Sequence, residues 1–222
     1  GHTNPTIEVV RELVKRGNQV HYYSFYEFRS RIEETGAVCI PCDDFMPPAP
    51  KDIDKKVGKD LSSLVDMTVD VTLAMEDKVL GELRAWKPDC IVSDSICIWG
   101  KLYAKKLNVP FVCSTTTFAF NQQTARLMKQ SLSELLRMLS GMPRINARLR
   151  QLRRHGYEIR QFYELLQNDN DTETIVYTSK EFQPMSETFS DKFTFTGPSI
   201  AVPKPSGHKK SRPLVYLSLI HI

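Results

Sequence analysis

A histidine and an aspartate are the two residues of this sequence whose types and surroundings favour acid–base chemistry. His2 lies in the stretch GHTNP, and residues 6–16 that follow carry apolar side chains at helical spacing, with Gly17 just beyond as a C-terminal cap. Pro5 suits the first turn of this helix, so we expect His2 in a loop that ends at a helix N-terminus. Asp94 follows a short apolar stretch, which predicts a place at the carboxyl end of a buried parallel strand. Ligands of open α/β sheets bind at that edge.

Together these two side chains could act as a general base. A carboxylate that accepts a hydrogen bond from one imidazole nitrogen fixes the tautomer and stabilises the imidazolium. The other nitrogen is then free to take a proton from a substrate hydroxyl. A lone histidine is more often structural, and the spacing around Asp94 fits capping of the following helix equally well. The loop position of His2 is what favours the general-base hypothesis.

Alternating strand and helix patterns predict the scaffold that positions both residues. Strands are expected at 18–25, 37–41, 90–93, 109–114, 174–179 and 193–198, and helices at 6–16, 26–36, 61–75, 95–107 and over much of 121–167. Helix-capping glycines close the first two helices. This alternation is typical of the α/β class and predicts a Rossmann-like, doubly wound parallel sheet, with one further strand expected before Gly1.

Composition and charge exclude several classes of function. Hydrophobic residues make up 41% of the chain, charged residues 25%, and the formal net charge is +4. No apolar run approaches the roughly 18 residues that a membrane-spanning helix needs, so a membrane span is not expected. A G-x-G sequence is absent, which argues against a dinucleotide or P-loop site. With so small a net charge, a solvated helix face explains the basic cluster better than contact with nucleic acid or a membrane. The cluster comprises Arg144, Arg148, Arg150, Arg153 and Arg154.

The five cysteines favour buried thiols in a reducing cytoplasm. Cys39 and Cys42 form a C-x-x-C pair, but no second pair of cysteines or histidines stands at zinc spacing. Asp43 and Pro41 supply no positive charge that would activate a thiolate. We therefore predict no metal site and no redox site at this pair, and a cytoplasmic protein.

Four segments, in order along the chain, resemble the amino-terminal half of the macrolide-type UDP-glycosyltransferases, a family of GT-B fold. They are GHTNP with its helix, VHYYSFYEFRSRIEETGA, KPDCIVSDSICIWGKLYAKKLNVP and ETFSDKFTFTGPSI. The resemblance implies an inverting, metal-independent transfer of a sugar to a hydroxyl of a small hydrophobic acceptor, such as a macrolide or another natural product. The donor would be a UDP-sugar or another NDP-sugar as co-substrate, with no other cofactor and no nucleic-acid partner. The family's general base corresponds to His2, and its aspartate partner corresponds to Asp94.

The resemblance also implies roles for the residues that follow the strand at 109–114. Ser114, Thr115 and Thr116 would place hydroxyl groups near the sugar, although a polar loop explains them equally well. Phe118 and Phe120 would form walls of the acceptor pocket, because pockets for apolar ligands are lined largely by such side chains.

By the same resemblance the chain divides into three parts. Residues 1–197 would form an acceptor-binding, Rossmann-like domain, 198–212 an interdomain linker, and 213–222 the start of a donor-binding domain. The strand expected before Gly1 is missing, which would leave His2 without the anchor of its own strand. The sequence ends on Leu219–Ile222 where the family continues with a Gly-Thr turn. We therefore expect most of the second domain to be missing and this chain alone to be catalytically silent.

Two further hypotheses stay open. The chain could come from another GT-B enzyme, such as a cell-wall precursor glycosyltransferase or a nucleotide-sugar epimerase, although ETFSDKFTFTGPSI disfavours both. It could also be a binding module without catalysis. In that case another chain would have to cover the open sheet edge, because unpaired edges invite association.

Overall fold

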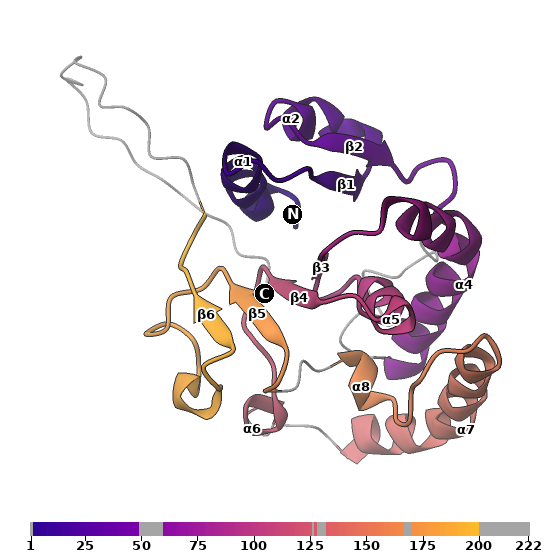
Figure 1. Ribbon diagram of the computed structural model, residues 1–222. Coiled ribbons are helices and arrows are strands. Elements are labelled where there is room, and N and C mark those ends of the chain that lie inside the picture. Colours follow the sequence, from indigo (N-terminus) through magenta and orange to yellow (C-terminus); the bar gives the residue numbers. More distant parts are fainter. Residues whose placement is uncertain (1, 49–59, 126, 128–131, 167–169, 200–222) are drawn as a thin grey trace, which may run out of the picture.

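The structure, a computed structural model, describes residues 2–48, 60–125, 127, 132–166 and 170–199 (Figure 1). Six parallel strands form two sheets. The first sheet pairs β1 (His21–Ser24) with β2 (Val38–Pro41), and the second has the order β3 (Ile91–Asp94), β4 (Phe111–Thr115), β5 (Glu173–Val176), β6 (Phe193–Phe195). The α/β class and the parallel pairing are as predicted. Almost all of the predicted linker and the predicted start of a second domain lie outside the described residues.

The single doubly wound sheet that the sequence predicts is divided in two within the described part of the chain. β1 pairs only with β2, and β3 pairs only with β4. A doubly wound sheet needs a central strand where its order reverses, and no described strand stands between β1 and β3. The amino-terminal end lies between the two sheets instead (Figure 1). This arrangement brings residue 2 to the carboxyl end of β3.

The first sheet carries two short helices and a small core of its own. The 3-10 turn η1 (Asn4–Thr6), which contains Pro5, leads into α1 (Ile7–Lys15), and η2 (Tyr26–Phe28) leads into α2 (Arg29–Glu33). A glycine is required after α2, because Gly36 has a φ of +90° and a Cβ there would lie 2.9 Å from Val14 Cγ1. The core joins both helices to β2 through Ile7, Val10, Ile32, Ala37 and Cys39, and the partly buried Tyr22 of β1 packs against it.

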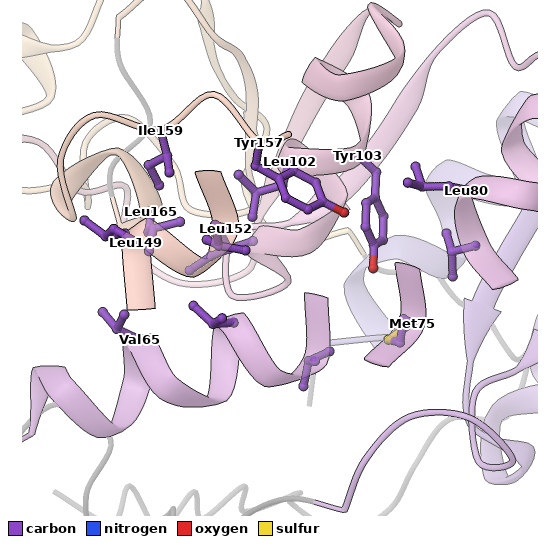
Figure 2. Packing of buried hydrophobic residues seen from close by; sticks show 14 of the residues in the cluster. Val65, Met75, Leu80, Leu102, Tyr103, Leu149, Leu152, Tyr157, Ile159 and Leu165 are labelled. Atoms are coloured by element: carbon purple, nitrogen blue, oxygen red, sulfur yellow. The ribbon is translucent and has the colours of Figure 1, made fainter. Parts of the chain in front are cut away.

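The larger core lies where three helices pack together beside the second sheet. They are α4 (Leu61–Trp86), α5 (Ile98–Leu107) and α7 (Leu132–Arg154). Figure 2 shows Val65 of α4 on the side of Leu149 and Leu152 of α7, and Met75 of α4 near Tyr103 of α5. Asp60 caps α4 by accepting hydrogen bonds from two backbone N–H groups, and α4 extends eleven residues beyond the stretch that sequence periodicity indicated.

Shorter elements complete the described part of the chain. They are α6 (Gln122–Ala125), α8 (Tyr163–Leu166) and the 3-10 turn η3 (Ser186–Thr188). Of the helices that the structure describes, none combines the length and the apolar character that crossing a bilayer would take.

The basic cluster on α7 is largely the predicted solvated face, because Arg144, Arg150, Arg153 and Arg154 are exposed and only Arg148 is half-buried. Arg148 is only 21% exposed and pairs with both Asp66 and Asp70 of α4, and Arg144 Nη2 lies 2.6 Å from Asp66 Oδ2. These pairs join α7 to α4 along the side of the core. Arg150 is exposed, as predicted. Sequence periodicity could not show this, because the acidic partners lie on another helix about eighty residues earlier.

Candidate active site

The ends of two neighbouring strands build the site. In the parallel register Asp94, the last residue of β3, stands beside Ser114 of β4, and Ser95 N donates a hydrogen bond of 2.9 Å to the Ser114 carbonyl. The loop before α5 and the loop after β4 therefore leave the same edge of the sheet. Carboxyl ends of parallel strands are where α/β folds collect ligand-binding residues.

His2 lies at this edge and is held by a side chain from each loop. Its Nδ1 is 2.9 Å from Asp94 Oδ2 and 2.7 Å from Thr116 Oγ1. The histidine side chain is 44% exposed, whereas that of Asp94 is 14% exposed. The structure thus brings together three of the predicted site residues. Thr116 is a second hydrogen-bond partner of His2, which the sequence prediction did not include.

The carboxylate selects one tautomer of His2. An unprotonated Nδ1 would point its lone pair at the negatively charged Asp94 oxygen, whereas a protonated Nδ1 donates to it. The Nδ1–H also lies within reach of Thr116 Oγ1, which accepts as a second partner. Nε2 then carries the free lone pair. This is the arrangement that a general base needs.

Backbone contacts fix the orientation of Asp94. Its Oδ1 accepts a hydrogen bond of 2.9 Å from Ile96 N, and its carbonyl accepts one of 2.9 Å from Cys97 N. Asp94 does not cap α5, whose N-cap is Cys97 without a side-chain hydrogen bond. One carboxylate oxygen of Asp94 instead binds the turn before that helix, and the other faces His2. The Ser93 hydroxyl donates to the Cys97 carbonyl over 2.8 Å and closes the same turn from the strand side.

A cavity of about 300 Å³ opens beside this turn and is lined mainly by apolar side chains. Such a volume is at the lower end of the range for small-molecule pockets. The predicted residues Asp94, Thr115, Phe118 and Phe120 all contribute to its lining. Cys97 lines it as well, and burial, with the Asp94 charge as a smaller cause, raises the pKa of its thiol to about 12. Cys97 is thus a neutral, weakly polar part of the lining.

The three hydroxyl residues after Cys113 point in different directions. Thr116 contacts His2, and Thr115 is buried and lines the cavity. Ser114 is also buried, but it hydrogen-bonds to the Tyr177 hydroxyl over 3.4 Å and does not line this cavity. Burial raises the pKa of Tyr177, and the nearby Asp94 charge adds to this, so both hydroxyls are neutral. The hydroxyl of Ser114 therefore faces Tyr177 and not the cavity.

Two residues beside the cavity had no role in the sequence prediction. Gln183 is buried and hydrogen-bonds to both backbone groups of Ala119, which connects the loop after β5 to the loop that carries Phe118. Phe182, next to it, lies against Phe118 with a distance of 5.5 Å between ring centroids. The stretch EFQPMSETF predicts a short helix or a turn there. A turn signal alone does not show which loop it packs against.

Both cysteines of the C-x-x-C pair are buried, Cys39 in β2 of the first sheet and Cys42 just after β2, in the larger core. Burial raises the pKa of the Cys42 thiol to about 12, with the neighbouring Asp43 charge as the next cause, which disfavours a reactive thiolate. Over the residues that the structure describes, no group of three or more histidine, cysteine, aspartate or glutamate side chains is placed to hold a metal ion.

Sequence comparisons connect the chain with glycosyltransferases. It is 28% identical to the NDP-glycosyltransferase YjiC of Bacillus subtilis and 31% identical to that of Bacillus licheniformis, over 99% of its own length and 54% and 55% of theirs. It is 30% identical to the demethyllactenocin mycarosyltransferase of Streptomyces fradiae, over 99% of its length and 50% of that protein's. The chain spans about half the length of the curated relatives it matches. No family model matches it.

Solved structures of glycosyltransferases share the fold. The glycotransferase of kitacinnamycin superposes with a TM-score of 0.69 and 22% identity, over 95% of this chain and 51% of that one. CalG4, the calicheamicin glycosyltransferase, superposes with a TM-score of 0.66 and 25% identity, over 90% of this chain and 49% of that one. The α/β arrangement described above is therefore that of about half of a GT-B glycosyltransferase.

Proposed function

Because the chain is a homologue of the NDP-glycosyltransferases along 99% of its length, we propose that it forms the acceptor-side half of such an enzyme. The whole enzyme would transfer a sugar from a UDP-sugar, or another NDP-sugar, to a hydroxyl of a small hydrophobic acceptor. The observation that carries this proposal is the 2.9 Å contact between His2 Nδ1 and Asp94 Oδ2 beside an apolar cavity. That geometry provides a base and a place for the alcohol it would activate.

In the proposed reaction His2 Nε2 takes the proton of the acceptor hydroxyl while that oxygen attacks the anomeric carbon of the sugar. The bond from this carbon to the diphosphate breaks, and the nucleoside diphosphate leaves with the electron pair. Attack from the face opposite the leaving group inverts the configuration at the anomeric carbon. Asp94 stabilises the imidazolium that forms, and Thr116 helps to hold the ring in place.

The lining of the cavity supports a hydrophobic acceptor. Phe118, Phe120 and Cys97 provide apolar surface close to Asp94, the hydrogen-bond partner of the proposed base His2. Similar proteins include a demethyllactenocin mycarosyltransferase and a calicheamicin glycosyltransferase, both named for natural products. We propose an acceptor of that general kind, a macrolide or another natural product with an exposed hydroxyl.

The donor would be held mainly outside the described residues. The chain spans about half of its relatives' length, and in the proposed division only residues 213–222 belong to the donor-binding domain. By this proposal residues 1–197 supply the acceptor side and the general base. The chain alone would then bind an acceptor without transferring a sugar.

The proposal is tested by joining this chain to the remaining half of the Bacillus licheniformis relative and measuring sugar transfer to a phenolic acceptor. His2→Ala should lower kcat by about 10²- to 10⁴-fold, the usual contribution of a general base. His155→Ala is the matched control, because its Nδ1 also faces a carboxylate, Glu76 Oε2 at 3.1 Å, and its side chain is 47% exposed. NMR of the product gives the anomeric configuration. Equal activity of the His2→Ala variant and the parent would refute the role of His2.

A further inference from the structure

Phe182 is an exposed aromatic residue that a turn holds in place. Its side chain is 72% exposed, the highest value among the large exposed hydrophobic residues of the described chain. The Ser179 carbonyl accepts hydrogen bonds from both Phe182 N, at 3.1 Å, and Gln183 N, at 3.0 Å. These polar contacts hold the backbone that carries the ring, although the ring itself is largely exposed.

Gln183 attaches this turn to the wall of the cavity. Its Oε1 accepts a hydrogen bond of 2.9 Å from Ala119 N, and its Nε2 donates to the carbonyls of Ala119 and Pro184, each over 3.1 Å. The amide is 4% exposed, so these bonds form away from competing water. Ala119 is the neighbour of Phe118, and the two aromatic residues are thereby held in a fixed relation.

The two rings form a continuous apolar surface that begins inside the cavity and extends out of it. Phe118 lines the cavity and is itself 38% exposed, so it lies where the cavity opens. Phe182 packs against it with ring centroids 5.5 Å apart and ring planes at 39°. Each ring therefore keeps part of a face free. Faces of this kind bind other aromatic rings in offset or edge-on geometry.

We propose that Phe118 and Phe182, the aromatic pair, bind a flat aromatic portion of the acceptor at the mouth of the cavity. Phe182 then determines specificity between planar and saturated acceptors, while the hydroxyl to be modified lies deeper, toward Asp94. This inference rests on the proposed function, since it names the class of acceptor for the same site. Aromatic contact of this kind changes an affinity by about two- to twelve-fold beyond simple burial.

Two alcohols of the same carbon skeleton test the proposal on the 222-residue chain. 2-Naphthol is flat and aromatic, whereas trans-2-decalol is saturated and puckered, and each carries one hydroxyl. Dissociation constants are measured by isothermal titration calorimetry, and competition between the two shows that they share a site. Phe182→Ala should weaken 2-naphthol about two- to twelve-fold and change the affinity for decalol by less than two-fold. Phe182→Leu, which keeps the apolar bulk without a ring, should weaken 2-naphthol as well.

Phe25→Ala is the matched control, because Phe25 is also an exposed phenylalanine, at 41%, but it follows β1 of the first sheet and does not line the cavity. It should alter neither affinity. Equal loss for both alcohols in Phe182→Ala, or no loss for either, overturns the role of the aromatic pair while leaving the acceptor cavity in place. If neither alcohol binds the parent chain, the cavity is not an acceptor site and the proposed function fails with it.

Discussion

At the scale of single residues, Asp94 has a different partner for each carboxylate oxygen. Oδ1 accepts from Ile96 N and Oδ2 faces His2 Nδ1, each at 2.9 Å. When the ring proton of His2 is on Nδ1, both partners donate an N–H to Asp94, and Nε2 of His2 keeps a free lone pair. An amide in place of the carboxylate can satisfy only one donor with its oxygen, and its NH₂ group has to face the other position.

Asp94→Asn is therefore expected to reverse the tautomer of His2. The amide oxygen stays on Ile96 N, and the NH₂ group then donates to His2 Nδ1, so the ring proton moves to Nε2 and the base is lost. Long-range ¹H–¹⁵N NMR of the ring nitrogens in this chain measures the change, and transfer in the joined enzyme should fall by about 10²- to 10⁴-fold. Thr116→Val is the control that keeps the carboxylate, and His2 should keep its Nδ1 proton. An unchanged spectrum in Asp94→Asn would contradict this account of His2.

The sequence permitted the pairing of His2 with Asp94 to be predicted, because both residues lie at loop positions on one edge of the sheet. The third partner, Thr116, was named only as one of three adjacent hydroxyl residues. Gln183 and Phe182 were missed entirely. Their contacts join loops more than sixty residues apart, and no local spacing signals such a contact. The sequence pattern alone does not show which loops pack against each other.

At the scale of elements, the junction of β3 and α5 holds the Asp94 turn. The helix approaches the strand so closely that a Cβ added at Gly100 would lie 2.3 Å from Ser93 Oγ and 2.4 Å from Ser93 Cβ. The same serine donates to the Cys97 carbonyl in the turn. Gly100 lies in the first turn of α5, where its lack of a Cβ permits the close approach.

Gly100→Ala is expected to lower the free energy of unfolding by about 1–3 kcal/mol, the usual cost of overpacking. Gly81→Ala in α4 is the matched control, since nothing lies within 4 Å of the added Cβ, and it should raise stability by about 0.5–1 kcal/mol. Urea unfolding measures both. Ser93→Gly in the Gly100→Ala background should recover much of the loss because it removes the clashing atoms. A Gly100→Ala variant as stable as the parent would show that the strand and helix are not in such close contact.

The end of one helix was predicted more closely than the end of another. Asn108, in left-handed conformation, ends α5 at the predicted boundary, whereas α4 continues beyond residue 75 to Trp86 and ends at Lys87, also in left-handed conformation. The division of the strands into two sheets has no comparable signal in these residues. β1 and β3 could belong to one sheet only if another strand lay between them. The sequence of either strand alone does not show the order of the strands.

At the scale of the whole molecule, one ionic cluster connects the helical core. Glu76 of α4 pairs with Lys106 at the end of α5 and with His155 just after α7. Lys106 Nζ also donates to the His155 carbonyl over 2.6 Å and lies 4.2 Å from the centre of the Tyr157 ring. Glu76 is 13% exposed and Lys106 is 19% exposed, so water screens these contacts less than it would on an open surface.

This cluster makes stability depend on pH in a predictable direction. Burial alone would raise the pKa of Glu76, but the hydrogen bond and charge of Lys106 outweigh it, and the pKa lies below its ordinary value of 4.5. The unfolded chain therefore binds the proton at a higher pH than the folded chain. The contribution of Glu76 is complete above about pH 4.5 and is lost as the pH falls through the folded-state pKa.

Glu76→Gln should accordingly cost about 1–1.5 kcal/mol of unfolding free energy at pH 7, because a charged hydrogen bond is replaced by a neutral one. The difference between variant and parent should be smaller at pH 3 than at pH 7, because protonation makes the carboxyl resemble the amide and the lower pH is closer to the folded-state pKa. Urea unfolding at both pH values measures it. Glu12→Gln, which removes a fully exposed pair with Arg16, should change stability little at either pH. An equal Glu76→Gln loss at both pH values would mean that the side chain acts through packing, and that its charge does not hold α4, α5 and α7 together.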